Sequence, residues 1–224
     1  MSQVEQARNG ILAALPQDDR DSVCRSASLV SLPSGQTLLR PGEPYVGVFF
    51  PVSGIISAVG LLKEGQHVEI AAIGSEGMVG LGTVFAVPKS RAWFVVQVPA
   101  HAYQVPVDVF IQLFHASAAL RTLTLAHAGR LMSDIVHSAI CNRFHSHRER
   151  LARWLVVTMR KSGQRSFALT HDCIAQMIGG SRHLVSVEFA GLRALGAVDY
   201  QRGQIEVIDE DKLLSAACDC IRNG

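Results

Sequence analysis

Residues 168–208 read ALTHDCIAQMIGGSRHLVSVEFAGLRALGAVDYQRGQIEVI, and this stretch decides the fold of the second half of the chain. Thr170 is a favourable N-cap for a helix over residues 171–178, whose apolar positions recur at helical spacing. Gly179-Gly180 supplies the backbone freedom of a tight turn, and Ser181 is a favourable N-cap for a second helix. The stretch therefore predicts two short helices joined by a tight turn.

The second predicted helix runs from the cap at Ser181 to about Leu195, and we expect its apolar stripe to face inward. Two short strands follow at 197–200 and 204–208, separated by Gln201-Arg202-Gly203, which is typical of a hairpin turn. Two helices joined by a tight turn and followed by a two-stranded wing define a winged helix-turn-helix. Such a module places the N-terminal turn of its second helix in the major groove of DNA.

The N-terminal turn of this second helix carries the side chains that we expect to contact base edges. Arg182 fits bidentate contact with guanine, a pairing that contributes ~1–3 kcal/mol of discrimination. His183 can donate to guanine, whereas Val187 can make only apolar contact, for example with a thymine methyl group. Backbone amides near the two caps suit phosphate oxygens. The expected DNA-contacting residues are Thr170, Ser181, Arg182, His183, Ser186 and Arg202.

The net charge of +2 is too small to indicate a polyanionic partner, but its distribution is uneven. Residues 1–146 hold ten basic and ten acidic side chains, so the whole excess lies in residues 147–224. Residues 143–165 carry seven basic side chains against Glu149 alone. Such a stretch can neutralise phosphates or can simply be a solvated helix face, and the charge pattern does not distinguish the two.

Ahead of this half, residues 30–107 alternate short runs of Val, Ile, Leu and Phe with turn signals. This pattern predicts antiparallel strands closed into a β-roll of the double-stranded jelly-roll type, with turns such as Pro51-Val52-Ser53-Gly54 between them. Two short helices are expected before the strands, over 3–15 and 18–26. We expect this β-roll domain to span residues 1–114.

Residues 117–144 contain no proline and place apolar and small residues three and four positions apart, which predicts a long helix. A small β domain cannot cover a helix of about 40 Å, at ~1.5 Å per residue, and this favours pairing with a second copy. The alternative is a helix packed on its own β domain. We expect a dimerisation helix and hinge over 115–146 and a DNA-binding domain over 147–224. The expected interface residues are Leu120, Leu123, Leu131 and Ile135.

The order of these parts, together with Ile178-Gly179-Gly180-Ser181-Arg182 and Leu195-Gly196-Ala197, resembles the Crp/Fnr family of bacterial transcription regulators over nearly the whole chain. Residues 73–80 and the Arg150-Leu151-Ala152 entry to the last domain are also similar to that family. The resemblance implies an α+β protein with a β-roll sensor of the cyclic-nucleotide-binding type, a long dimerisation helix and a winged helix-turn-helix. It further implies a cytoplasmic homodimer that binds palindromic promoter DNA, and that contacts RNA polymerase if it activates transcription.

Cyclic-AMP-binding members of the family carry a Gly-Glu-Leu segment for the ribose and an Arg-Ser pair for the phosphate. Here the first becomes Gly77-Met78-Val79 or Val79-Gly80-Leu81, without the glutamate, and the second reads Ser90-Arg91 in inverted order. Ile135-Val136 replaces the polar pair that contacts adenine. Lys89 or Arg91 could still hold a phosphate, but the pattern does not favour cyclic AMP. The pocket residues that the resemblance implies are Met78, Val79, Gly80, Ser90, Arg91 and Ile135.

Metal and haem chemistry find little support in the sequence. The iron–sulfur members of the family carry an N-terminal cysteine cluster, whereas only Cys24 lies in the first 140 residues here, so we expect no such cluster. Cys218-x-Cys220 lies close to the C-terminus without further ligands beside it, and we expect no metal site there. His145-x-His147 is interpreted as a pair of surface residues. Haem ligation by one of the nine histidines stays an open alternative.

Other classes of function fit the sequence less well. The uncharged residues 44–62 could span a bilayer by length, but Pro51 and Gly54 interrupt them, so we expect no membrane segment. A cupin-type enzyme needs clustered ligands, and residues 30–107 contain only two histidines, His67 and His101, so we expect no catalytic residues. The alternative to a DNA-binding regulator is a small-molecule-binding module that acts through a protein partner, which salt-dependent duplex binding would exclude.

Overall fold

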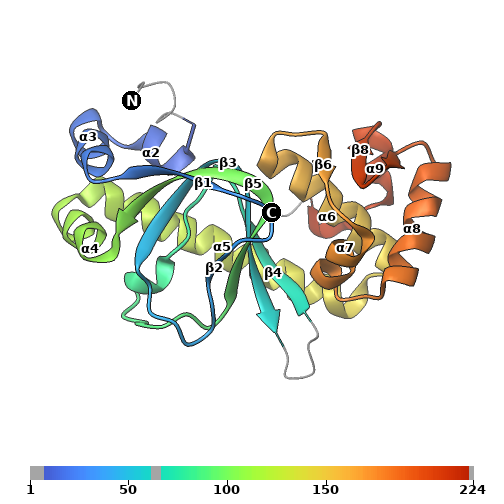
Figure 1. Cartoon of the computed structure of the whole chain (residues 1–224), viewed down its shortest axis with the longest axis horizontal. Coiled ribbons are helices and arrows are strands. Elements are labelled where there is room, and N and C mark those ends of the chain that lie inside the picture. Colours follow the sequence, from blue (N-terminus) through green and yellow to red (C-terminus); the bar gives the residue numbers. More distant parts are fainter. Residues whose placement is uncertain (1–7, 62–66, 222–224) are drawn as a thin grey trace. The chain divides into compact units, whose positions relative to one another are not determined.

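The structure is a computed structural model that describes residues 8–61 and 67–221 (Figure 1). The chain forms two compact units. The first unit contains Met1–Ala58 and Ile73–Met132, and the second contains Val59–Ala72 and Ser133–Gly224. The expected α+β class is confirmed, with an antiparallel sheet, a long helix and a C-terminal helix-turn-helix that carries a small sheet.

The larger sheet has five strands, in the region where the sequence predicts them. Its hydrogen-bonded order is β1 (Ser28–Leu32), β5 (Trp93–Pro106), β3 (Gly47–Leu61) and β4 (His67–Ile73), with β2 (Thr37–Leu39) paired to β5. β1 runs antiparallel to β5, in a register that sets Leu32 opposite Ala100. The 3-10 helix η1 (Leu81–Thr83) lies between β4 and β5.

Two apolar clusters form the core of the first unit. Phe50, Met78 and Leu120 lie in one cluster, and Phe49 and Val79 lie in the other. Neighbouring residues along β3 fall into different clusters because successive side chains of a strand point to opposite faces of the sheet. The alternation places an apolar layer on each face of the strand.

Three short helices gather at one end of the sheet (Figure 1). They are α2 (Gly10–Ala14), α3 (Gln17–Arg25) and α4 (Val107–Ala116). The helix predicted over 3–15 is described only from residue 8, and α2 begins after Asn9, whose buried side chain accepts from the amides of Ile11 and Leu12. The same side chain donates to the carbonyl oxygens of Pro51 and Gly77, each at 2.8 Å. One polar residue thereby ties α2 to strand β3 and to the loop that follows β4.

The turn predicted at residues 51–54 is wrong, because β3 continues through all four of them. Gly54 has a φ of +73°, in the left-handed region, and a Cβ there would overlap the carbonyl oxygen of Pro99 in β5. A glycine at such a position lets the strand bend and approach its neighbour closely without reversing direction. The proline and glycine therefore mark a local distortion within one long strand.

The long helix predicted over 117–144 is confirmed as α5 (Ala118–Phe144). Its residues up to Met132 belong to the first unit, and those from Ser133 onward belong to the second. Within the described residues, no single helix has both the length and the apolar character needed to cross a membrane. Only α4 and α5 taken together meet that criterion, and they are bent by 111° at the break between them.

The second unit contains the winged helix-turn-helix and the remaining helices (Figure 1). Its helices after α5 are α6 (His147–Ser162), α7 (His171–Ile178), α8 (Arg182–Ala194), α9 (Glu210–Ala216) and the 3-10 turn η2 (Asp219–Ile221). Its three-stranded sheet has the order β6 (Ser166–Ala168), β8 (Gln204–Val207) and β7 (Val198–Gln201). The two helices and the wing predicted within residues 168–208 are confirmed, whereas β6 and α9 are additions that the sequence interpretation did not contain.

The junction between α5 and α6 is closed by a capping box at Ser146 and Glu149. The Glu149 amide donates to Ser146 Oγ at 3.3 Å, while the Ser146 amide and hydroxyl donate to the Glu149 carboxylate at 2.8 and 2.7 Å. The hydroxyl and amide of Ser146 hold the pKa of the Glu149 carboxyl below its ordinary value. The box fixes the start of α6 at residue 147.

Ser146→Ala is expected to lower the free energy of unfolding by about 1 kcal/mol at neutral pH, because it removes the cap. A depressed pKa in the folded state means that the stabilisation is present above the ordinary pKa of glutamate and is lost as the pH falls through the lowered value. Urea unfolding at neutral and acidic pH checks this. The difference between the parent protein and the variant should narrow in acid, and a constant difference would count against the capping box.

Candidate nucleic-acid interface

The helix-turn-helix is formed by α7 and α8, and both predicted caps are in place. Thr170 Oγ1 accepts from the Cys173 amide, and Ser181 Oγ accepts from the Leu184 amide, each at 3.2 Å. Gly179 ends α7 with a φ of +67°, a left-handed conformation that a residue with a Cβ rarely adopts. The chain can therefore turn within two residues before α8 begins.

Helix α8 separates an inner face from an exposed one. Val185, Phe189 and Leu192 are buried, as predicted. The exposed face carries Arg182, with 71% of its side chain accessible, together with His183, Val187, Ala190 and Arg193. Arg182 lies 3.5 Å from the Asp172 carboxylate, a solvated pair that contributes little and that a ligand could readily displace.

The wing presents Arg202 at its tip. Arg202 has a φ of +51° and Gly203 one of +81°, so the two residues form the centre of a tight hairpin between β7 and β8. The Arg202 side chain is exposed. Within the same unit, Arg193 Nε donates to the Asp199 carboxylate of β7 at 2.8 Å, which ties the end of α8 to the base of the wing.

Sequence reasoning missed His171, which connects α7, α8 and the wing. Its ring lies 4.4 Å from the ring of Tyr200 and 5.3 Å from that of Phe189, and its Nδ1 lies 2.9 Å from Ser186 Oγ. Burial, assisted by the charge of Arg182, lowers the pKa of His171, which favours the neutral ring. Ser186 therefore lies in an internal contact between the two helices, although the sequence interpretation assigned it to DNA.

Two family models match the chain. Residues 149–216 match the Crp-like helix-turn-helix domain, and residues 29–117 match the cyclic nucleotide-binding domain. The chain belongs to the Crp/Fnr family. It is therefore a DNA-binding transcription regulator rather than an enzyme.

Relatives of this Crp/Fnr regulator share its fold at low identity. The global nitrogen regulator of Synechococcus elongatus is 22% identical over 187 residues, which cover 78% of this chain and 83% of that protein. A Crp/Fnr-family regulator from Eubacterium rectale superposes with a TM-score of 0.72 at 16% identity, over 93% of this chain and 98% of that one. FixK2 from Bradyrhizobium japonicum gives 0.69 at 16%, over 86% and 98%.

The residues that the resemblance implies for a ligand pocket are largely used in packing. Met78 and Val79 are 0% and 2% exposed within the two apolar clusters, and Gly80 adopts a φ of +112° against Val48. Buried Ser90 donates to the carbonyl of Ala92. The two others, Arg91 on its loop and Ile135 on α5, are exposed. At Met78, the position where the resemblance implies a ligand, a side chain of the regulator itself contacts the backbone.

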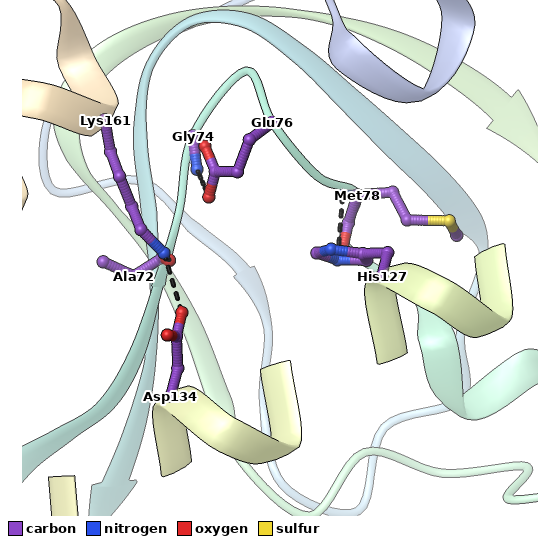
Figure 2. Close-up of polar contacts among 7 residues, drawn as sticks. All are labelled: Ala72, Gly74, Glu76, Met78, His127, Asp134 and Lys161. Carbon is purple, nitrogen blue, oxygen red and sulfur yellow. Dashed lines mark hydrogen bonds and ion pairs between the residues drawn. The ribbon is translucent and has the colours of Figure 1, made fainter. Parts of the chain in front are cut away.

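That side chain is His127, which projects from α5 against the Met78 backbone (Figure 2). Its Nε2 lies 3.1 Å from both the amide nitrogen and the carbonyl oxygen of Met78. A Cβ at Gly77 would overlap the imidazole ring, so the glycine is needed for this contact. A different hollow of about 320 Å³ lies elsewhere in the first unit, lined by Tyr45, Thr83, Ala86, Val87, Pro88, Val107 and Ile111.

The four residues expected at a dimer interface differ in exposure. Leu120 is 1% exposed and lies in the core of the first unit, against which Leu123 also packs, while Leu131 packs against the second cluster of that unit. Ile135 is 39% exposed. Besides Ile135, the exposed apolar side chains of α5 are Leu125, Met132, Val136, Ile140 and Phe144.

The expectation that Cys218 and Cys220 lack further ligands is wrong. Cys141 in the last turn of α5 and His145 just after that helix lie beside them, and the donor atoms of the four residues are all within 4.8 Å of one another. The i, i+4 spacing of Cys141 and His145 was a signal available in the sequence. This spacing alone does not indicate a metal site. Cys218 lies 77 residues from Cys141 in the sequence, and only folding of the second unit brings the two together.

Proposed function

We propose that this regulator acts as a homodimer on palindromic promoter DNA, with α8 of each copy in the major groove. An effector, or a change in the amount of the protein, would change how many dimers are able to bind DNA. The observation that carries the proposal is the N-terminal turn of α8, where Arg182 and His183 are both exposed. Arginine in this position suits the paired acceptors of guanine.

A stripe of exposed apolar side chains on α5 supports assembly as a dimer. Met132 is 67% exposed and Val136 is 55% exposed, and they follow Leu125 and precede Ile140 at spacings of seven and four residues. Such spacing keeps apolar side chains on the seam of a two-stranded coiled coil. A second copy of α5 is the occupant that matches both the length and the pattern of this stripe.

The DNA half-site that α8 recognises should differ in sequence from one recognised by an arginine followed by a glutamate. Glutamate accepts from the amino group of cytosine, whereas His183 can donate and exposed Val187 can contact a thymine methyl group. Selection of bound duplexes from random DNA would measure this preference. Recovery of a half-site with a cytosine contact at the His183 position would contradict the assignment.

Arg182→Ala is expected to lower affinity for the selected duplex by about 10-fold to 100-fold, because one bidentate base contact contributes ~1–3 kcal/mol. Arg202→Ala is the matched comparison, since it removes an arginine that is expected to contact only phosphate. It should weaken binding to all sequences alike and reduce the salt slope by about one. Fluorescence anisotropy with specific and scrambled duplexes at several salt concentrations separates the two effects.

The same titrations test the proposal as a whole. Phosphate contacts make the logarithm of affinity fall linearly with the logarithm of salt concentration. Absence of any salt-dependent duplex binding would overturn the proposal and favour a module that acts through a protein partner. Equal losses on specific and scrambled DNA for Arg182→Ala would show that Arg182 does not read bases.

A further inference from the structure

Three buried cysteines and one histidine meet at the end of α5 in the second unit. Cys141 Sγ lies 3.3 Å from Cys218 Sγ, and Cys220 Sγ lies 3.8 Å from His145 Nδ1. The three cysteines are between 3% and 8% exposed and form a small cluster of their own. The four residues come from two segments: Cys141 lies in the last turn of α5 and His145 directly after it, while Cys218 directly precedes the turn η2, which contains Cys220.

The spacing of the four donor atoms matches a tetrahedral metal site. With Zn–S bonds of about 2.3 Å, two thiolates of a tetrahedral site lie ~3.8 Å apart. The Cys141 and Cys218 sulfur atoms lie 3.3 Å apart, and no two of the four donor atoms are more than 4.8 Å apart. We propose that Cys141, His145, Cys218 and Cys220 bind one tetrahedral thiophilic cation per chain, with zinc as the expected ion. Cys₃His is an established donor set for structural zinc.

A positively charged side chain lies where a metal-bound cluster would need one. A divalent cation with three thiolates carries a net charge of −1, which needs a compensating cation when it is buried. Arg153 of α6 provides one, because its charge acts on both Cys141 and Cys218. Its buried Nε has no hydrogen-bond acceptor among the described residues. A thiolate on the metal would give this N–H an acceptor.

The cluster also borders a hollow of the second unit. This hollow has a volume of about 160 Å³ and is lined by Cys220 together with two carboxylates, Glu69 and Asp134, and three cations, Arg153, Arg160 and Lys161. Burial raises the pKa of the Cys141 and Cys218 thiols, so a metal ion would have to displace their protons on binding.

A disulfide between Cys141 and Cys218 is the competing use of these residues. Their 3.3 Å separation is well above the ~2.05 Å of an S–S bond, and a disulfide would leave Cys220 and His145 without a role. Metal binding uses all four residues. It would also fasten the C-terminal segment to the helix that leads into α6, and loading should therefore raise the thermal unfolding midpoint of the protein.

Cobalt titration of the full-length protein tests the site. The protein is reduced with a phosphine, stripped with a chelator and titrated with Co²⁺ under anaerobic conditions. We expect one equivalent per chain, with the intense visible absorption of tetrahedral Co²⁺ and a near-ultraviolet thiolate charge-transfer band. Both signals should disappear when Zn²⁺ is added. A titration with no tetrahedral spectrum, or quantitative Cys141–Cys218 disulfide in freshly prepared metal-free protein, would overturn the proposal.

Variants assign the signal to the cluster. Cys220→Ser and Cys218→Ser should each lower Co²⁺ affinity by more than about 100-fold, since loss of even an outer-shell partner typically costs 10–100-fold. Cys173→Ser is the matched control, because Cys173 lies on α7 in the same unit outside the cluster. It should bind Co²⁺ as the parent does, and loss of the signal in this control would contradict the assignment.

His145→Ala keeps the experiment informative if a cysteine variant fails to fold, which circular dichroism would reveal. His145 is only half-buried, so the variant retains the apolar environment of the three sulfur atoms. Removing the nitrogen ligand should shift the visible Co²⁺ bands and weaken binding while the charge-transfer band remains. An unchanged spectrum would show that His145 is not a ligand and would overturn the four-residue site.

Discussion

Met132→Asp is expected to convert the regulator from a dimer into a monomer. Met132 is 67% exposed in a single chain, so the substitution leaves the packing of each chain intact. In a paired α5 it would bring two carboxylates into an apolar seam without cations to neutralise them. Burial of an unpaired charge costs several kcal/mol, and a total above about 4 kcal/mol corresponds to a roughly 1000-fold weaker dimer.

Analytical ultracentrifugation over a range of protein concentrations would measure this change. Arg130→Asp is the control, because Arg130 is exposed on a different face of the same helix and its replacement alters charge even more. The control should remain a dimer. Equal behaviour of the two variants would mean that the apolar stripe of α5 is not the contact between copies.

Gly54→Ala is expected to lower the free energy of unfolding by about 3–5 kcal/mol, enough to leave much of the first unit unfolded in a marginally stable protein. Two costs combine at this position. The φ of +73° is unfavourable for alanine, and the added Cβ would overlap the backbone of Pro99 and Ala100. Backbone atoms of a paired strand cannot move aside as a flexible side chain can.

Gly42→Ala separates the two costs. Gly42 has a φ of +86°, yet a Cβ there would meet nothing within 4 Å, so only the conformational cost of about 1–2 kcal/mol applies. Urea denaturation of both variants gives the comparison. Similar losses for the two alanines would show that the close approach of β3 and β5 at Gly54 is less tight than the structure has it.

The helix-turn-helix could be predicted from sequence because its signals are local. The hydroxyls of Thr170 and Ser181 accept from amides only three residues further along, and Gly179 takes the conformation that its residue type favours. Interactions of this range depend on neighbouring residues alone. The boundaries of α7 and the start of α8 therefore agree with the sequence prediction.

Other features depend on distant parts of the chain and could not be predicted in this way. Gly54 has the signature of a turn, and only the approach of β5 shows why a glycine is needed within a strand. Leu120 fits an interface pattern on α5 but is covered by the core of its own unit. Cys218 gains its neighbours only through folding of the second unit. Periodicity shows which residues share a face, and tertiary packing decides what covers it.

The internal contacts of His171 have a consequence for how operators are distinguished. Because the imidazole stacks on Tyr200 and is bonded to Ser186, the wing and α8 should rotate as one rigid body. When the groove width or curvature of a duplex does not match the fixed spacing of α8 and the wing, the DNA must deform. The protein cannot move α8 and the wing apart to fit the duplex. The energy of bending or twisting DNA depends on its sequence. Base pairs that no side chain touches should therefore influence which promoters are occupied.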